Sequence, residues 1–413
     1  MNPVLTLAWR NIWRNRRRSF LTLSAIGFSC VLLIFMLSWQ NGSYETMIQA
    51  SVSTSTGHLQ IQAESYLDEP KIRTTLKDPQ RILDQLSQVA GLKSFAPRAE
   101  GFALASTDSR SYGISVTAID PVQEETVTSI KNLVKRGEYF KEDSFNAALI
   151  GAKLARNLGV DIGDEIVLLG QGYDGSVAAG FVEVSGIMES GNDEMDRTVA
   201  YVPLNWFQDT YSMGERVHRI LIQGEELNRI KELQHQVRSV LKNVDNGNKR
   251  LVVLSWWEIV PGLLQMIQLD LFSGLIMYAL LVFVVAFSIL NTFLMAVFER
   301  THEFGILLSL GTTHKRLTVL LFLESLLLTL CGILAGTALG IVLTLYVEGI
   351  GIRIPETEAI MRQFGLPDRI FPKLSFLTVT LGPLFVFIIT ALSALYPAIR
   401  VRKLSLVQAL RAS

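Results

Sequence analysis

Four long apolar blocks divide the chain: Phe20–Trp39, Leu271–Phe298, Leu317–Val347 and Leu374–Ile399. Each block has at least 20 residues, and Glu324 is the only Asp, Glu, Lys or Arg within them. A helix of about 20 apolar residues crosses about 30 Å of hydrocarbon. The pattern predicts an integral membrane protein with four transmembrane α-helices. It excludes a soluble cytoplasmic enzyme, a disordered chain and a nucleic-acid-binding protein.

The long segment between the first two blocks, residues 40–270, has the mixed pattern of an α+β domain. Alternating or apolar runs with turn residues at their ends predict strands, and apolar residues at helical spacing predict helices. The expected strands are Gly57–Ala63, Ser94–Thr107, Ser111–Ile119, Asp164–Leu169, Ser176–Met188 and Val217–Gln223, and the expected helices are Pro79–Val89, Ala152–Leu158, Pro203–Tyr211 and Glu225–Leu241. We expect two lobes, with a strand-rich lobe near residues 134–216 inserted into an α/β lobe.

Composition agrees with a membrane protein. Hydrophobic residues make up 49% of the chain and charged residues 18%, where soluble domains have about 25% charged residues. The mean hydropathy is +0.33. The 38 basic and 38 acidic residues cancel in number but are not evenly spread. Residues 40–270 hold 22 Lys and Arg against 31 Asp and Glu, a net charge of −9.

Basic residues near the ends of the blocks predict the topology. The first 19 residues hold five arginines and no acid, and basic residues also predominate in residues 299–316 and 400–413. Because positive charge near membrane ends stays cytoplasmic, we place these three segments in the cytoplasm and residues 40–270 and 348–373 outside it. The first segment is expected to be an amphipathic helix. Topology alone accounts for most of its arginines, and anionic headgroups would add to the effect.

Three features of the apolar blocks predict helix contacts. Gly332, Gly336 and Gly340 fall on one stripe, which lets helix backbones approach closely; packing within the chain is favoured over a dimer interface. Asn291 and Glu324 lie at similar depth and are expected to pair, as a polar latch rather than a proton or substrate path. The second span is expected to extend outward from Trp256 as one long helix; alternatively, the tryptophan pair there is an interfacial anchor.

Catalytic and metal-binding motifs are missing from the sequence. We find no phosphate-binding loop, no zinc-protease motif and no Cys/His cluster. The glycine-rich stretch Gly170–Gly175 has no helix after it and is read as a hairpin turn. We therefore predict no catalytic residue, no metal site and no cofactor in this chain.

Residues 299–311 read ERTHEFGILLSLG, and residues 397–411 read PAIRVRKLSLVQALR. Both patterns, with the opening LAWRNIWRNRRRSF, resemble the FtsX-like permeases, the membrane subunits of ABC transporters that include MacB and the lipoprotein-releasing LolC and LolE. The resemblance covers essentially the whole chain. It implies that an ATPase docks on a short cytoplasmic coupling helix at about residues 300–311. The contact residues carried over are Arg300, Glu303, Gly305, Ile306, Leu307, Leu310 and Gly311.

The resemblance also implies the partners. Two copies of the ATPase would hold ATP and Mg²⁺, and a second permease chain, identical or a sister, would complete the complex. MacB carries its ATPase before its first span, whereas only about 19 residues precede the first block here, and no Walker motif is present. This departure favours a separate ATPase and the LolC/LolE type of permease. The expected location is the bacterial inner membrane, with the large domain in the periplasm.

The leading hypothesis for function is extraction of lipoproteins, or another amphiphile, from the inner membrane. Apolar residues at the outer ends of the first two spans would contact the cargo: Met36, Trp39, Met47, Leu263, Met266, Ile267 and Leu271. For any one of them, lipid contact or domain packing is the simpler explanation. A MacB-like exporter of a drug, peptide or toxin, with a periplasmic carrier or adaptor, is the second hypothesis. The third is a signalling transmitter that controls a periplasmic enzyme.

Overall fold

The computed structural model describes residues 3–400, apart from residues 142, 243, 245, 247–249, 354, 356–366 and 368. The chain forms two compact units. The helical unit comprises the described residues within 1–45, 267–353 and 369–413, and the sheet unit comprises those within 46–266 and 354–368. The predicted tail, residues 401–413, lies outside the described residues, as does half of the predicted loop 348–373.

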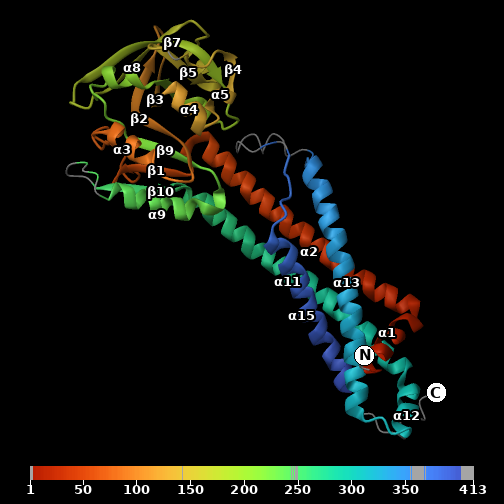
Figure 1. Ribbon diagram of the computed structural model, residues 1–413. Coiled ribbons are helices and arrows are strands. Elements are labelled where there is room, and N and C mark those ends of the chain that lie inside the picture. Colours follow the sequence, from red (N-terminus) through yellow and green to blue (C-terminus); the bar gives the residue numbers. More distant parts are fainter. Residues whose placement is uncertain are drawn as a thin grey trace. The chain divides into compact units, whose positions relative to one another are not determined.

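The helical unit consists of long helices and two short ones near one end (Figure 1). Its elements are α1 (Pro3–Arg14), α2 (Arg16–Ser51), α11 (Pro261–Glu299), α12 (Thr301–Ser309), α13 (His314–Ile350) and α15 (Phe376–Arg400). Helices α2, α11, α13 and α15 are long and apolar enough to cross a membrane, and each contains one of the four apolar blocks. The prediction of four spans is confirmed.

Two of the spanning helices differ in length from the prediction. Helix α2 continues beyond Trp39, where the apolar block ends, to Ser51. Near this extension, Tyr44 Oη donates to Asp270 Oδ2 at 2.6 Å, and Tyr278 Oη donates to Gln40 Oε1 at 3.0 Å. These contacts explain the extension, because they give polar residues outside the apolar block partners on α11.

The second span extends outward beyond Leu271, as predicted, but α11 begins at Pro261 and not at Trp256. Trp256–Ile259 forms a separate short helix, α10, and Val260 leaves the helical conformation with φ −121° and ψ 69°. The cause is Pro261, because a proline disfavours helical backbone at the residue before it. Helix α11 starts at that proline, where the missing N–H costs nothing.

The sheet unit is built on ten strands with short helices around them (Figure 1). The strands are β1 (Leu59–Ala63), β2 (Leu92–Ser106), β3 (Ser111–Ile119), β4 (Val134–Gly137), β5 (Ala147–Gly151), β6 (Glu165–Gln171), β7 (Val177–Met188), β8 (Val199–Pro203), β9 (Arg219–Gly224) and β10 (Leu251–Ser255). They lie in the order β10-β1-β9-β2-β3-β8-β5-β7-β4, and β6 pairs with β2 and β7. This is the expected α+β domain.

Part of the sheet closes on itself. Strand β2 pairs with β9 along Leu92–Arg98 and with β3 along Arg98–Ser106, while its last residues also pair with β6. Pairing then runs from β3 through β8, β5, β7 and β6 back to β2, so a ring of strands shares β2 with the open part of the sheet. The predicted inserted lobe near residues 134–216 therefore starts too late, because β3 and the second half of β2 already belong to the ring.

Short helices complete the sheet unit. They are α3 (Pro79–Leu86), α4 (Pro121–Val127), α5 (Ile130–Leu133), α6 (Ala152–Leu158), α7 (Met195–Thr198), α8 (Leu204–Thr210) and α9 (Ile230–Leu241), with single turns at η1 (Val52–Thr56) and η2 (Leu227–Arg229). The predicted helix at Pro79 is present as α3, and Asp78 caps it by accepting from the Arg81 N–H. Gly159 ends α6 in the left-handed region, with φ 74°, a conformation that glycine adopts without strain.

Two buried histidines should make the stability of the sheet unit sensitive to acid. His58 Nδ1 accepts from the Gly224 N–H at 3.0 Å, and His218 Nδ1 accepts from the Glu100 N–H at 2.9 Å. Burial lowers the pKa of each histidine from 6.5 to about 4. The two histidines bind protons more readily in the unfolded chain than in the folded one. Folding is therefore fully stabilised by the neutral histidines above pH 6.5, and this contribution to the free energy of unfolding is lost as the pH falls towards 4.

We expect amide hydrogen exchange in β9 and β2 of the full chain to accelerate at least about tenfold as the pH falls through this window, after correction for intrinsic rates. The side-chain oxygen of asparagine can accept the same hydrogen bond but does not become protonated in this pH range. The double variant His58→Asn, His218→Asn should therefore show less acid acceleration of exchange. His235 is exposed, and His235→Asn is the matched control. Equal acid sensitivity in the double variant would contradict the assignment.

Candidate coupling site

Helix α12 is held between α11 and α13 by a small apolar cluster. Phe304 is fully buried and packs with Val297, Leu317 and Leu321. At the other end of α12, Gly311 has φ +92°, which favours glycine, and its N–H donates to the Leu308 carbonyl at 3.1 Å. The short helix therefore has a fixed buried side, which leaves its other side exposed.

The residues expected to contact an ATPase divide between these two sides. Ile306 and Leu310 are 44% and 77% exposed, and Gly311 is also exposed. Leu307 is half-buried against the apolar cluster. Gly305 is buried, so it cannot be a contact residue in this conformation; this part of the prediction is corrected. We call His302, Ile306, Ser309 and Leu310 the exposed α12 face.

A chain of charged groups ties α12 to its neighbours. Glu303 Oε2 lies 2.6 Å from Arg14 Nη2 of α1 and 3.2 Å from Arg300 Nε. Arg300 Nη1 in turn lies 3.0 Å from both carboxylate oxygens of Glu324 on α13. Asn11 Nδ2 of α1 donates to Glu324 Oε2 at 3.4 Å. Helices α1, α12 and α13 thus meet in one polar network.

Electrostatics at the network favour the charged state of its exposed carboxylate. The hydrogen bond from Arg14, followed by that from Arg300, lowers the pKa of Glu303. A second ion pair, between Arg18 of α2 and Glu299 at the end of α11, lies beside the network. Two arginines of the N-terminal cluster are therefore bound to glutamates at the end of α11 and in the first turn of α12.

The predicted pairing of Glu324 with Asn291 is wrong. The partners of Glu324 are Arg300 and Asn11, and Asn291 lies on the exposed side of α11. The prediction considered depth in the membrane but not rotation about the helix axis. The long Arg300 side chain, at the end of α11, reaches the carboxylate that the sequence placed about 10 Å deep.

Sequence reasoning missed Asn11, Arg14, Arg18 and Glu299 as members of this site. Membrane topology already accounts for arginines at these positions, so the sequence gives no separate indication that two of them have specific partners. A usable signal was the contrast between an acid-free N-terminal segment and the acids at positions 299 and 303. Opposite charges on two segments assigned to the same side of a membrane are candidates for ion pairs.

A small cavity lies beside the polar network. Its polar lining comes from Arg18, Ser19, Thr22, Arg300, Glu324 and Ser325, with apolar side chains of α1, α11, α13 and α15 around them. Its volume, about 60 Å³, has room for a few water molecules. It is too small for an acyl chain or a peptide, so it is not a path for cargo in this conformation.

The stripe of three glycines on α13 lies against α2. A Cβ atom at Gly336 would lie 2.4 Å from the Gly27 carbonyl oxygen, and one at Gly332 would lie 2.9 Å from the Ile26 side chain. Gly340 is next to Ile34, at 3.2 Å by the same measure. The three positions therefore allow two helix backbones to approach more closely than a side chain would permit.

The residues proposed for cargo contact are divided between the two units. Met36, Trp39, Ile267 and Leu271 belong to the helical unit, and Met47, Leu263 and Met266 belong to the sheet unit. Ile267 is buried, whereas Leu271 and Met266 are exposed. A shared cargo surface remains a prediction.

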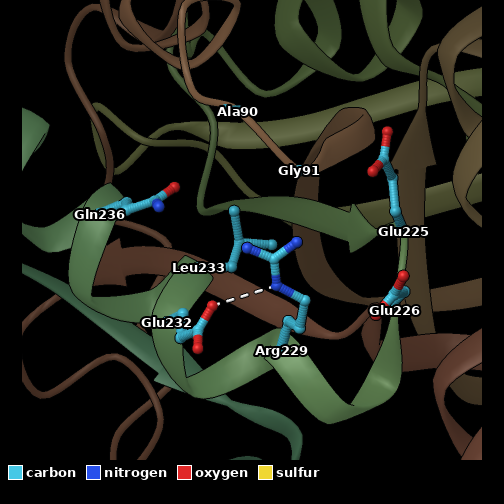
Figure 2. A pocket seen from close by; sticks show the side chains of 8 residues that line it. All are labelled: Ala90, Gly91, Glu225, Glu226, Arg229, Glu232, Leu233 and Gln236. Carbon is cyan, nitrogen blue, oxygen red and sulfur yellow. Dashed lines mark hydrogen bonds and ion pairs between the residues drawn. The ribbon is translucent and has the colours of Figure 1, made fainter.

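The sheet unit has its own pocket at the start of α9 (Figure 2). Ala90, Gly91, Glu225, Glu226, Arg229, Glu232, Leu233 and Gln236 line it. Arg229 Nε pairs with Glu232 Oε2 at 3.1 Å, and both side chains are about two-thirds exposed. The pocket is a solvated charged surface. Among the described residues no group of three His, Cys, Asp or Glu side chains could hold a metal ion.

Large apolar side chains gather on the outer face of β2, β6 and β7 in the ring. Phe102, Leu104, Leu169, Val177 and Phe181 are between 36% and 79% exposed. Leu104 and Leu169 are direct partners across the β2–β6 pairing, so these side chains share one face. Contiguous exposed apolar surface of this kind is typical of a protein interface.

Comparisons with known proteins cover the whole of this arrangement. Residues 19–240 match the MacB-like periplasmic core domain family, and residues 275–406 match the FtsX-like permease C-terminal family. The lipoprotein-releasing system transmembrane protein LolE of Haemophilus influenzae is 24% identical over 427 residues, with 99% of each chain covered. The pyoverdine export ATP-binding/permease protein PvdT of Pseudomonas syringae is 25% identical, with 82% of this chain and 51% of PvdT covered.

Among solved structures, the extracellular domain of the transporter YknZ from Gram-positive bacteria matches 48% of this chain and 99% of that domain. The sequence identity is 18% and the TM-score is 0.35.

Proposed function

Because this chain belongs to the family of FtsX-like ABC transporter permeases with a MacB-like periplasmic core domain, we propose that it couples ATP hydrolysis by a separate ATPase chain to motion of its periplasmic domain. The ATPase, in two copies, docks on the exposed α12 face and holds ATP and Mg²⁺. A second permease chain, identical or a sister, completes the complex. The observation that carries the proposal is the exposure of Ile306 and Leu310 on a helix whose other side is fixed.

The polar network provides a route by which movement of α12 on ATPase docking could be transmitted to the membrane helices. An ATPase that moves α12 also pulls on Glu303 and Arg300, and through them on α1 and α13. Charged hydrogen bonds of this kind are directional and resist separation. The proposed topology places α1, α12 and the C-terminal tail in the cytoplasm of a bacterium, and the sheet unit in the periplasm.

For the cargo we propose lipoproteins, extracted from the inner membrane for sorting to the outer membrane. The support is the similarity to LolE along nearly the full length of both chains. The similarity to PvdT supports the alternative of an exporter that moves a small molecule, peptide or toxin from the periplasm. In either case the exposed apolar face of β2, β6 and β7 is the surface best suited to a periplasmic carrier or adaptor. A transmitter that controls a periplasmic enzyme is the third candidate.

The docking surface is tested by introducing charge on it. Ile306→Asp with Leu310→Asp should lower co-purification of the ATPase with the full-length chain at least about tenfold, since desolvating a carboxylate in an apolar interface costs more than 1.4 kcal/mol. Affinity capture in mild detergent with mass spectrometry measures the loss. Ile162, 42% exposed in the sheet unit, provides the matched control Ile162→Asp. Unchanged capture of the ATPase by the double variant would exclude this face.

The same capture experiment separates the cargo hypotheses. A sister permease and acylated proteins in the complex support lipoprotein release. An outer-membrane duct or adaptor supports the exporter, and a periplasmic hydrolase without lipid cargo supports the transmitter. Absence of any ATPase would exclude the coupling mechanism itself.

A further inference from the structure

Helix α1 presents distinct sides. Ala8 and Ile12 are buried within the helical unit. Asn11 and Arg14 face the polar network, bound to Glu324 and Glu303. The remaining side is exposed, and neither packing within the unit nor the network accounts for the residues found there.

That exposed side is aromatic. Trp9 and Trp13 are 45% and 51% exposed. Trp9 and Trp13 are one helical turn apart, and their ring centroids lie 6.1 Å apart in an edge-to-face arrangement. A pair of half-exposed tryptophans next to a spanning helix is typical of side chains at the level of lipid headgroups.

Cations flank the tryptophans. Of the five N-terminal arginines, Arg14 and Arg18 pair with glutamates. The side chains of Arg10, Arg16 and Arg17 are exposed, and within the described part of the chain none of these three forms an ion pair. Two of them, Arg16 and Arg17, begin α2 directly after the turn at Asn15.

The sequence offers these three arginines few acids nearby. The first acidic residue of the chain is Glu45, and residues 401–413 contain no Asp or Glu. The acids that contact this segment already have other partners: Glu299 and Glu303 bind Arg18 and Arg14, and Glu324 binds Asn11 and Arg300. Arg10, Arg16 and Arg17, which lie close to the tryptophan pair in the sequence, are therefore suited to binding an anion from outside the chain.

We propose that Trp9, Trp13, Arg10, Arg16 and Arg17 form a binding surface for anionic phospholipid headgroups. The tryptophans sit at the headgroup level, and the guanidinium groups bind phosphate oxygens through pairs of N–H donors. The partner is the membrane in which α2 begins, because Arg16 and Arg17 lie at the first turn of a spanning helix. This inference does not depend on the proposed ATPase or cargo.

The site has a structural consequence for the coupling segment. Ser19 Oγ donates to the Ile12 carbonyl at 2.5 Å, which fixes α1 to the start of α2. Headgroups bound on the outer side of α1 would hold it in place while Arg14 and Asn11 bind Glu303 and Glu324 on the inner side. Anionic lipid is therefore expected to stabilise the polar network around α12.

The test uses the full chain in nanodiscs of mixed phosphatidylcholine and phosphatidylglycerol, with native mass spectrometry of the lipids that stay bound. The wild-type chain should retain phosphatidylglycerol in excess of its share in the disc. Arg10→Gln, Arg16→Gln and Arg17→Gln together should reduce that selectivity, by up to about fivefold for each charge removed. The corresponding three lysine substitutions keep the charges and should preserve most of it.

Exposed cations of the sheet unit provide the matched control. Lys77, Arg81 and Lys93 are exposed, and their replacement by glutamine removes the same charge far from α1 in sequence. Phosphatidylglycerol selectivity should be unchanged in this control. Wild-type selectivity in the glutamine variant of α1 would overturn the proposal, and so would an equal loss in the control, since the effect would then be one of net charge.

Discussion

Gly336→Leu is expected to prevent stable packing of α13 against α2. Any side chain at position 336 places its Cβ 2.4 Å from the Gly27 carbonyl oxygen and 2.7 Å from the Gly27 Cα. Both atoms are backbone, so neither can rotate away, and the two helices must separate. Overpacking of well-packed interiors costs about 1–3 kcal/mol, and a backbone clash of this kind should reach the upper end, about 3 kcal/mol.

The measurement is the thermal unfolding midpoint of the full chain in detergent. Gly349 lies near the end of the same helix, and a Cβ atom there would meet nothing within 4 Å, so Gly349→Leu is the matched control and should unfold like the wild type. If Gly336→Leu unfolds at the wild-type temperature, the close approach of α2 and α13 does not exist in the protein.

The glycine stripe illustrates what the sequence could predict at this level. Small residues at every fourth position predict a close contact with another helix, but they do not indicate which helix is the partner. The partner segment, around Gly27, Cys30 and Ile34 of α2, has no repeated pattern of its own. Spacing along one helix is a local property, whereas the choice of neighbour depends on how all four spans pack together.

The sheet unit shows the same limit. Elements with local signals were predicted, such as α3 with its Asp78 cap and the β6–β7 hairpin around the glycine-rich turn. The closure of the ring was not, because it depends on the parallel pairs β3–β8 and β5–β7 between segments distant in sequence. Hydrophobic periodicity sets the faces of a strand but leaves its neighbours open.

At the coupling site, residue types were predicted better than contacts. Glu324 was singled out because a charge inside an apolar block must find a partner. Its partner was assigned by depth alone, and the structure instead supplies Arg300 from the end of α11. An arginine side chain is long enough for its guanidinium to lie at a different membrane depth from its backbone. Residues outside the apolar blocks therefore have to be considered as partners for residues within them.

Loss of the Arg300–Glu324 ion pair is expected to be the second large effect. The two side chains are 16% and 21% exposed, so Glu324→Leu removes the closer counter-charge of a guanidinium that is largely shielded from water and leaves it only Glu303. Removing one member of a buried pair costs about 3–5 kcal/mol; partial exposure favours the lower end, about 3 kcal/mol. ATP-dependent function of the complex should fall with it, because Arg300 also holds Glu303 beside the exposed α12 face.

Charge reversal distinguishes an ion pair from a packing effect. Arg300→Glu and Glu324→Arg should each lower the unfolding midpoint and the ATP-dependent function, and the double variant should recover part of both. The interaction free energy from this double-mutant cycle is expected to exceed about 1 kcal/mol. Because Glu303 and Asn11 also bind the pair, recovery should be incomplete: the reversed pair places a carboxylate next to Glu303. Additive losses in the double variant would show that the two residues act separately, and the network could not then transmit movement of α12 to α13.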